Sequence, residues 1–132
     1  MADEERLELR IELFDKATTA LKRALAEPED EFLRDSIIKR FELSYETARK
    51  LMRQWLIDQG EATGQATKRE VMEAAFRTGL IGDADLWSEL TRCRNDSSHE
   101  YEQDKAIEAV AFIRQRAVVA FDALSQEIKL RT

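Results

Sequence analysis

The sequence contains a single cysteine, Cys93, and a single histidine, His99, among its 132 residues. One cysteine cannot form an intrachain disulfide, which excludes a disulfide-stabilised scaffold. Structural metal sites made from cysteine and histidine need several such ligands, so a cluster of this kind is excluded as well. We therefore expect no metal ion and no cofactor, and we expect Cys93 to be a reduced, structural thiol. Any acid–base chemistry that uses an imidazole must use His99.

Glycine and proline are also scarce, with four residues and one residue respectively. Sandwiches and barrels need many short strands joined by turns, so this composition excludes them. The length suits a single domain, which we place at residues 1–132. No apolar run approaches the roughly 20 residues that span a bilayer. Residues 1–10 lack a signal-peptide core, so we expect a cytoplasmic protein without membrane contact.

Acidic residues outnumber basic ones, 27 to 21, and the net charge is −6. Long-range attraction therefore does not bring this chain to nucleic acid, and an RNA site would need a local basic patch. Arg49 and Arg53 belong to a basic run between residues 39 and 53, and we name them as possible RNA contacts. The alternative is a solvated helix face on which these cations pair with Glu42 and Glu46.

Apolar residues recur at steps of three and four along most of the chain, as in amphipathic helices. Thr67 and Glu70 have the spacing of a capping box, and Gly79 is placed to end the helix that they start. The predicted helices are Leu7–Leu25, about Glu29–Ile57, a short one after Thr67, a short one after Asp83, and a last long one through Ile107–Ile128. Together they predict an all-α fold, an antiparallel up-and-down bundle of about five helices.

The stretch Arg94–Tyr101 lies between the last two predicted helices and contains no aliphatic residue. Ser97 and Glu100 have capping-box spacing, so we expect Ser97 to start the last helix and His99 to lie in its first turn. The helix dipole there disfavours imidazolium and favours a neutral base. Residues five apart on one continuous helix point about 140° apart. Arg94 and His99 therefore converge on one ligand only if the chain turns between them or a second subunit supplies one of them.

These residue types suit attack on a phosphodiester. His99 is able to accept the proton of a ribose 2′-hydroxyl or to donate one to the leaving oxygen. Arg94 is able to hold the phosphate and stabilise the charge that develops, and Asn95 to orient either group. The alternative is a structural connection, in which Arg94 neutralises the end of a helix and Tyr101 is a half-buried aromatic residue.

Arg94, His99 and Tyr101 together have the spacing Arg-x4-His-x-Tyr. This resembles the signature of HEPN domains in the HepT toxin branch, relatives of which were named nucleotidyltransferase substrate-binding proteins. The likeness covers roughly residues 33–124. Three further segments also resemble the family: Arg40–Glu46, Gly79–Asp83 followed by Trp87, and Tyr101–Ala106.

The resemblance implies a metal-independent ribonuclease with RNA as its substrate. Arg94 and His99 would be its catalytic pair and Asn95 a polar supporter. It also implies that a minimal nucleotidyltransferase antitoxin adenylylates Tyr101. The added phosphate would repel and block RNA.

The resemblance further implies a homodimer whose cleft holds two copies of the motif. Trp55, Trp87 and Phe112 are candidates for the apolar dimer surface, and the same positions suit a core.

The signature of the nucleotidyltransferase itself, Gly-Ser followed by paired aspartates after a strand, is absent from the sequence. Asp83-Ala84-Asp85 follows a glycine turn, and we interpret Asp83 as a helix cap. Nucleotidyl transfer would therefore be performed by a partner. Two functions stay open: a ribonuclease toxin silenced at Tyr101, and a non-catalytic substrate- or nucleotide-binding subunit of a two-component nucleotidyltransferase.

Overall fold

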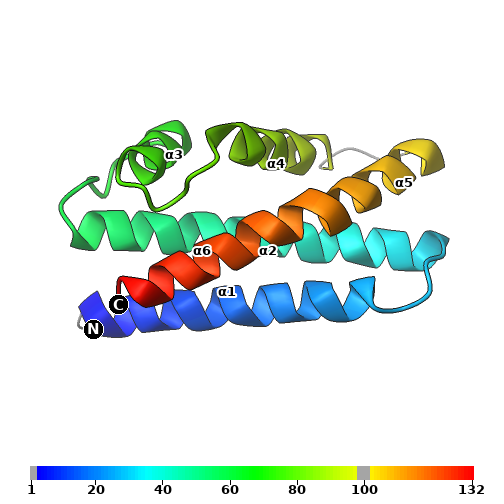
Figure 1. The fold of residues 1–132 in the computed structure, drawn as a ribbon, viewed down its shortest axis with the longest axis horizontal. Helices are drawn as coiled ribbons and strands as arrows, with labels where there is room; N and C mark the ends of the chain where they lie inside the picture. Colours follow the sequence, from blue (N-terminus) through cyan, green and yellow to red (C-terminus); the bar gives the residue numbers. More distant parts are fainter. Residues whose placement is uncertain (1–2, 98–101) are drawn as a thin grey trace.

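The fold is a bundle of helices, known from a computed structural model that describes residues 3–97 and 102–132 (Figure 1). Two long helices are followed by two short ones and by a last long helix with a π-helical turn in its middle. The elements are α1 (Asp3–Leu25), α2 (Glu31–Asp58), α3 (Lys68–Arg77), α4 (Ala84–Asp96), α5 (Gln103–Phe112), η1 (Ile113–Ala117) and α6 (Val118–Leu130). The predicted all-α antiparallel bundle of about five helices is confirmed for the described residues, with α5, η1 and α6 counted as one continuous helix.

The helix boundaries follow local capping chemistry. Asp30 caps α2 by accepting a hydrogen bond of 2.7 Å from the Leu33 N–H. The capping box predicted before α3 is present, with the Thr67 and Glu70 side chains each accepting from the other residue's backbone. Asp83 caps α4, as predicted. Each cap satisfies an N–H group that the first helical turn leaves without a partner.

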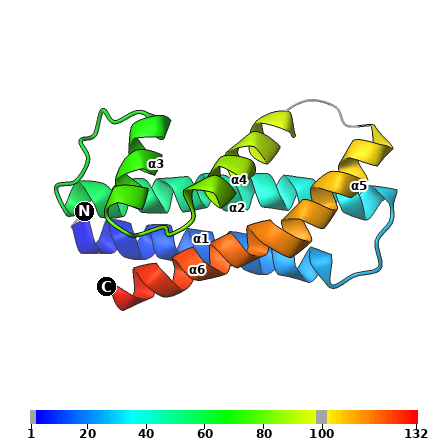
Figure 2. The same ribbon diagram turned by 45° about the horizontal axis from the view of Figure 1, so that its top comes forward.

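The helices are layered around α2. Helix α1 lies antiparallel along one side of α2, and α3 and α4 lie on the opposite side (Figure 1). The last helix runs obliquely across the bundle, so that α5 contacts α2 and α6 contacts α1 (Figure 2). This arrangement brings the C-terminal turn of α4 over the middle of α2.

Four aromatic rings from four helices form the centre of the core. Phe121 of α6 packs edge-on against Phe14 of α1, with ring centroids 5.9 Å apart, and it lies 6.1 Å from Phe41 of α2 and 6.1 Å from Trp87 of α4. Ser44 is the one buried polar residue in the described part of the chain, and its hydroxyl donates to the Arg40 carbonyl. The core is therefore built from every long helix and from α4, with smaller side chains of α3 at its edge.

The structure corrects the candidate dimer surface. Trp55 and Trp87 are only 7% and 4% exposed, so both belong to the core, because the faces that carry them turn toward other helices. Phe112 is partly buried and packs against the same core. Large apolar side chains that do lie at the surface include Phe32, Leu43, Val119 and Leu130.

None of the helices in residues 3–97 and 102–132 combines the length and the apolar character needed to cross a membrane.

Candidate functional site

Two of the six predicted site residues lie at the C-terminal end of α4. Arg94 and Asn95 are in its last turn, whereas His99 and Tyr101 lie outside the described residues. Helix α4 ends at Asp96, between Arg94 and His99. The convergence of Arg94 and His99 on a common ligand stays a prediction.

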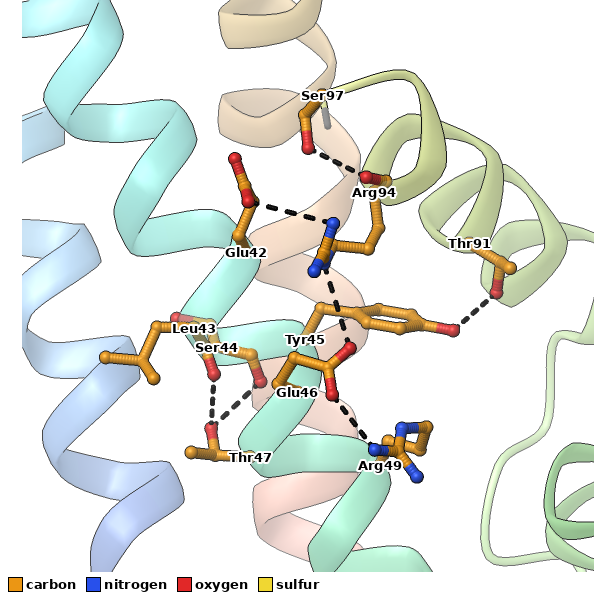
Figure 3. Close-up of polar contacts among 10 residues, drawn as sticks. All are labelled: Glu42, Leu43, Ser44, Tyr45, Glu46, Thr47, Arg49, Thr91, Arg94 and Ser97. Carbon is orange, nitrogen blue, oxygen red and sulfur yellow. Dashed lines mark hydrogen bonds and ion pairs between the residues drawn. The ribbon is translucent and has the colours of Figure 1, made fainter. Parts of the chain in front are cut away.

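The predicted cap at Ser97 is wrong. Ser97 ends α4, and its hydroxyl donates a hydrogen bond of 2.8 Å back to the Arg94 carbonyl (Figure 3). Helix α5 begins only at Gln103, after Glu102, whose side chain makes no capping hydrogen bond. The capping-box spacing gave a wrong prediction because the hydroxyl of a serine at the end of a helix is also able to donate to a carbonyl of the preceding turn.

The Arg94 guanidinium lies between two carboxylates of α2. Arg94 Nη1 is 3.7 Å from Glu42 Oε2, and Arg94 Nε is 3.7 Å from Glu46 Oε1 (Figure 3). Both distances are too long for a hydrogen bond, so charge attraction holds the side chain in place. Arg94 Nε is buried and has no hydrogen-bond partner. The guanidinium is thus positioned, and at least one of its donors is unused.

Glu46 is shared by two arginines. Its Oε2 accepts a hydrogen bond of 2.9 Å from Arg49 Nη2, while Oε1 faces Arg94. Partial burial of Glu46 opposes its ionisation, but the hydrogen bond from Arg49 and the positive charges of Arg49, Lys68 and Arg94 outweigh that effect. The pKa of Glu46 therefore lies below its usual value. Glu46 is a carboxylate at neutral pH and anchors both cations.

The contacts of Glu42 and Glu46 with Arg94 were not predicted from the sequence. The predicted pairing with cations of their own helix is correct for Arg49 and Glu46 but incomplete. The available signal was their spacing: residues four apart lie on one face of a helix and are able to hold one long cationic side chain between them.

Arg53, the second possible RNA contact, binds the loop after α2. Its guanidinium donates to the Ala66 carbonyl at 2.6 Å and to the Gly64 carbonyl. Contact of Arg49 and Arg53 with RNA stays a prediction, and both have a structural partner in the free protein.

A groove of about 810 Å³ extends from Arg94 and Asn95 between α3 and α4. Its floor is Tyr45 of α2, whose hydroxyl is 2.7 Å from the Thr91 hydroxyl and whose ring lies 6.4 Å from that of Trp87. Burial raises the pKa of Tyr45, so its phenol is protonated at neutral pH. The contacts of Tyr45 with Thr91 and Trp87 hold α4 against α2, and they therefore fix where Arg94 lies relative to Tyr45.

Cys93 is a partly buried thiol one residue before Arg94. Burial, followed by the nearby charges of Asp96 and Glu42, raises the pKa of this thiol to about 11, so it is protonated at neutral pH. Within the described ranges, no three His, Cys, Asp or Glu side chains are grouped closely enough to hold a metal ion.

Known proteins resemble this chain in sequence and in fold. Residues 9–130 match the family model described as "Nucleotidyltransferase substrate binding protein like". A protein of Haemophilus influenzae called "Probable ribonuclease HepT" is 35% identical over 79 residues, which are 58% of this chain and 54% of that protein. The chain therefore matches about half the length of this relative.

Two solved structures have the same fold. HI0074 from Haemophilus influenzae, described as having the fold of a substrate binding domain of a nucleotidyltransferase, superposes with a TM-score of 0.80 at 25% identity, over 90% of this chain and 98% of that one. The protein ttk003001694 from Thermus thermophilus superposes with a TM-score of 0.71 at 26% identity, over 89% and 97%. With the family model matching most of the sequence, the chain belongs to the nucleotidyltransferase substrate binding protein-like family.

Proposed function

We propose that this chain is a HepT-like toxin, a metal-independent ribonuclease that a minimal nucleotidyltransferase antitoxin silences. The observation that carries the proposal is the Arg94 guanidinium, which lines the groove between α3 and α4 and is held there by Glu42 and Glu46. Such a group is prepared to bind a phosphate. The relative named as a probable ribonuclease supports the same conclusion.

In the proposed reaction, a ribose 2′-oxygen forms a bond to the adjacent phosphorus while the bond from phosphorus to the 5′-oxygen breaks. One His99 takes the proton of the 2′-hydroxyl or donates a proton to the leaving 5′-oxygen. In a homodimer, the His99 of the second copy performs the other of these two proton transfers. Arg94 stabilises the negative charge that develops on the phosphate oxygens. Asn95 supports the phosphate from the same helical turn.

Expressing this chain alone should stop bacterial growth, and co-expressing the cognate nucleotidyltransferase should restore it. The purified chain should also cleave single-stranded RNA in the presence of a metal chelator. Harmless expression together with RNA that the purified chain leaves intact would contradict the ribonuclease function.

A second function is favoured by the family description and by the description of HI0074. In it, the chain is a non-catalytic subunit that binds the substrate or nucleotide of a nucleotidyltransferase. Arg94 would then hold a phosphate without cleavage. Stable binding of RNA or a nucleotide without any product would favour this function over the first.

Tyr101 is the proposed site of adenylylation. Its phenol oxygen would attack the α-phosphorus of ATP, the phenolic proton would pass to a base or water, and pyrophosphate would leave. Incubation with the nucleotidyltransferase and ATP should add at least one AMP to the intact chain, measured by mass spectrometry. Tyr101→Phe should abolish this gain, and Tyr45→Phe, which removes a buried phenol, should not. An adduct that persists in Tyr101→Phe would place the modification elsewhere.

A further inference from the structure

The wall of the groove opposite Arg94 has no role in the reaction described above. It is formed by α3, which places Met72 and Phe76 along the apolar part of the groove. Phe76 is 51% exposed, although it belongs to a helix whose other face is buried in the core. A large aromatic side chain that stays half exposed inside a groove presents a surface on which a planar ligand is able to stack.

The groove is lined by charged side chains of both signs. Three cations line it, Lys68, Arg69 and Arg94, against the two carboxylates Glu46 and Glu73. Arg69 pairs with Glu73, and Arg94 lies between Glu42 and Glu46, so Lys68 carries the excess positive charge of the groove on a chain whose net charge is −6. The negative backbone of a nucleic acid would bind at Lys68 and at the outer nitrogens of Arg94.

The groove also has the size and the polar groups of a ligand site. Its volume of about 810 Å³ lies within the range of roughly 300–1,000 Å³ that is usual for ligand pockets. Ser88 and Asn95 line it and carry groups that are able to hydrogen bond to base edges or sugar hydroxyls. Apolar, aromatic, cationic and polar groups therefore meet in one groove that is continuous with Arg94.

We propose that the groove between α3 and α4 binds one nucleotide of single-stranded RNA, with the base against Phe76 and the phosphate directed toward Arg94. The strand must be single there, because a base paired in a duplex does not expose its face to a side chain. The proposal rests on the proposed function and extends it: Phe76 and Lys68 bind substrate, whereas Arg94 also takes part in the reaction.

The test measures binding separately from cleavage. The full chain carrying His99→Ala is titrated against a fluorescein-labelled oligoadenylate, and the dissociation constant is followed by fluorescence anisotropy. Adding Phe76→Ala should raise the Kd about 5- to 100-fold, because stacking on one aromatic ring is lost, and Phe76→Tyr should restore most of the affinity. The matched control is Phe32→Ala, which removes an 82% exposed phenylalanine that does not line the groove and should leave the Kd unchanged.

Lys68→Gln is a second variant, on a residue that lies at the surface. It should lower the slope of log Kd against log salt concentration by about one. Unlabelled single-stranded RNA should compete for the groove, and duplex RNA of the same sequence should not. Circular dichroism of each variant checks that its helices are intact.

The outcomes separate this proposal from the ribonuclease function. Binding that depends on Phe76, in a wild-type chain that cleaves no RNA, would support the nucleotide site and overturn the ribonuclease. Cleavage of RNA with the same Kd in Phe76→Ala and Phe32→Ala would overturn the nucleotide site alone. Loss of nucleotidyltransferase binding in Phe76→Ala, with the affinity for RNA unchanged, would also overturn it and would make the groove a protein interface.

Discussion

Replacing Arg94 with alanine should lower the rate of RNA cleavage by about 10²- to 10³-fold, the usual cost of losing a positioned group that stabilises developing charge. The structure supports a large effect because the guanidinium is held in place before substrate binds, by Glu42 and Glu46 at 3.7 Å each. Arg94→Lys should recover only part of the rate, since an ammonium lacks the planar fork of donors that matches a phosphate. Single-turnover rates measured with excess enzyme report the chemical step.

The matched control for Arg94→Ala is Arg92→Ala, two residues earlier on α4, because Arg92 is exposed and does not line the groove. It should change the rate little. His99→Ala should lower the rate by about 10²- to 10⁴-fold through loss of proton transfer. Equal rates for the Arg94 and Arg92 variants would place the reaction elsewhere on the chain.

The largest expected loss of stability follows from truncating Phe121. Its ring is 1% exposed and packs against Phe14, Phe41 and Trp87, so that it joins α6 to α1, α2 and α4. Phe121→Ala should lower the free energy of unfolding by about 3–5 kcal/mol, because it removes buried apolar surface and leaves a cavity. Urea unfolding followed by circular dichroism measures this change.

Val119→Ala provides the comparison on the same helix. Val119 is 59% exposed, so its truncation should change the free energy of unfolding by no more than about 0.5 kcal/mol. Similar losses in the two variants would mean that Phe121 is not central to the core.

The sequence predicted the helices and most of their boundaries correctly. The capping box of Thr67 and Glu70 and the cap at Asp83 are both present, and α2 begins two residues after the predicted start at Glu29. These features depend on side chains within three or four residues of the backbone groups that they satisfy. The prediction at Ser97 failed because its hydroxyl had two possible backbone partners, a carbonyl before it and an N–H after it, and spacing alone does not choose between them.

Burial was harder to predict from sequence. Trp55 and Trp87 have the same periodicity whether their face meets another helix or a second subunit, and only the packing of α2 and α4 places both in the core. Conversely, the structure leaves Phe76 of the short helix α3 half exposed in the groove.

For the candidate site, local sequence identified Arg94 and Asn95 as polar residues between two predicted helices, and named His99 and Tyr101 by their spacing from Arg94. Chain order alone did not reveal the two carboxylates that hold Arg94, or the groove that continues from it to Phe76. The physical reason is the range of the interactions. Helix periodicity and capping act between residues a few positions apart, whereas Glu46, Phe76 and Arg94 meet only because α2, α3 and α4 pack together.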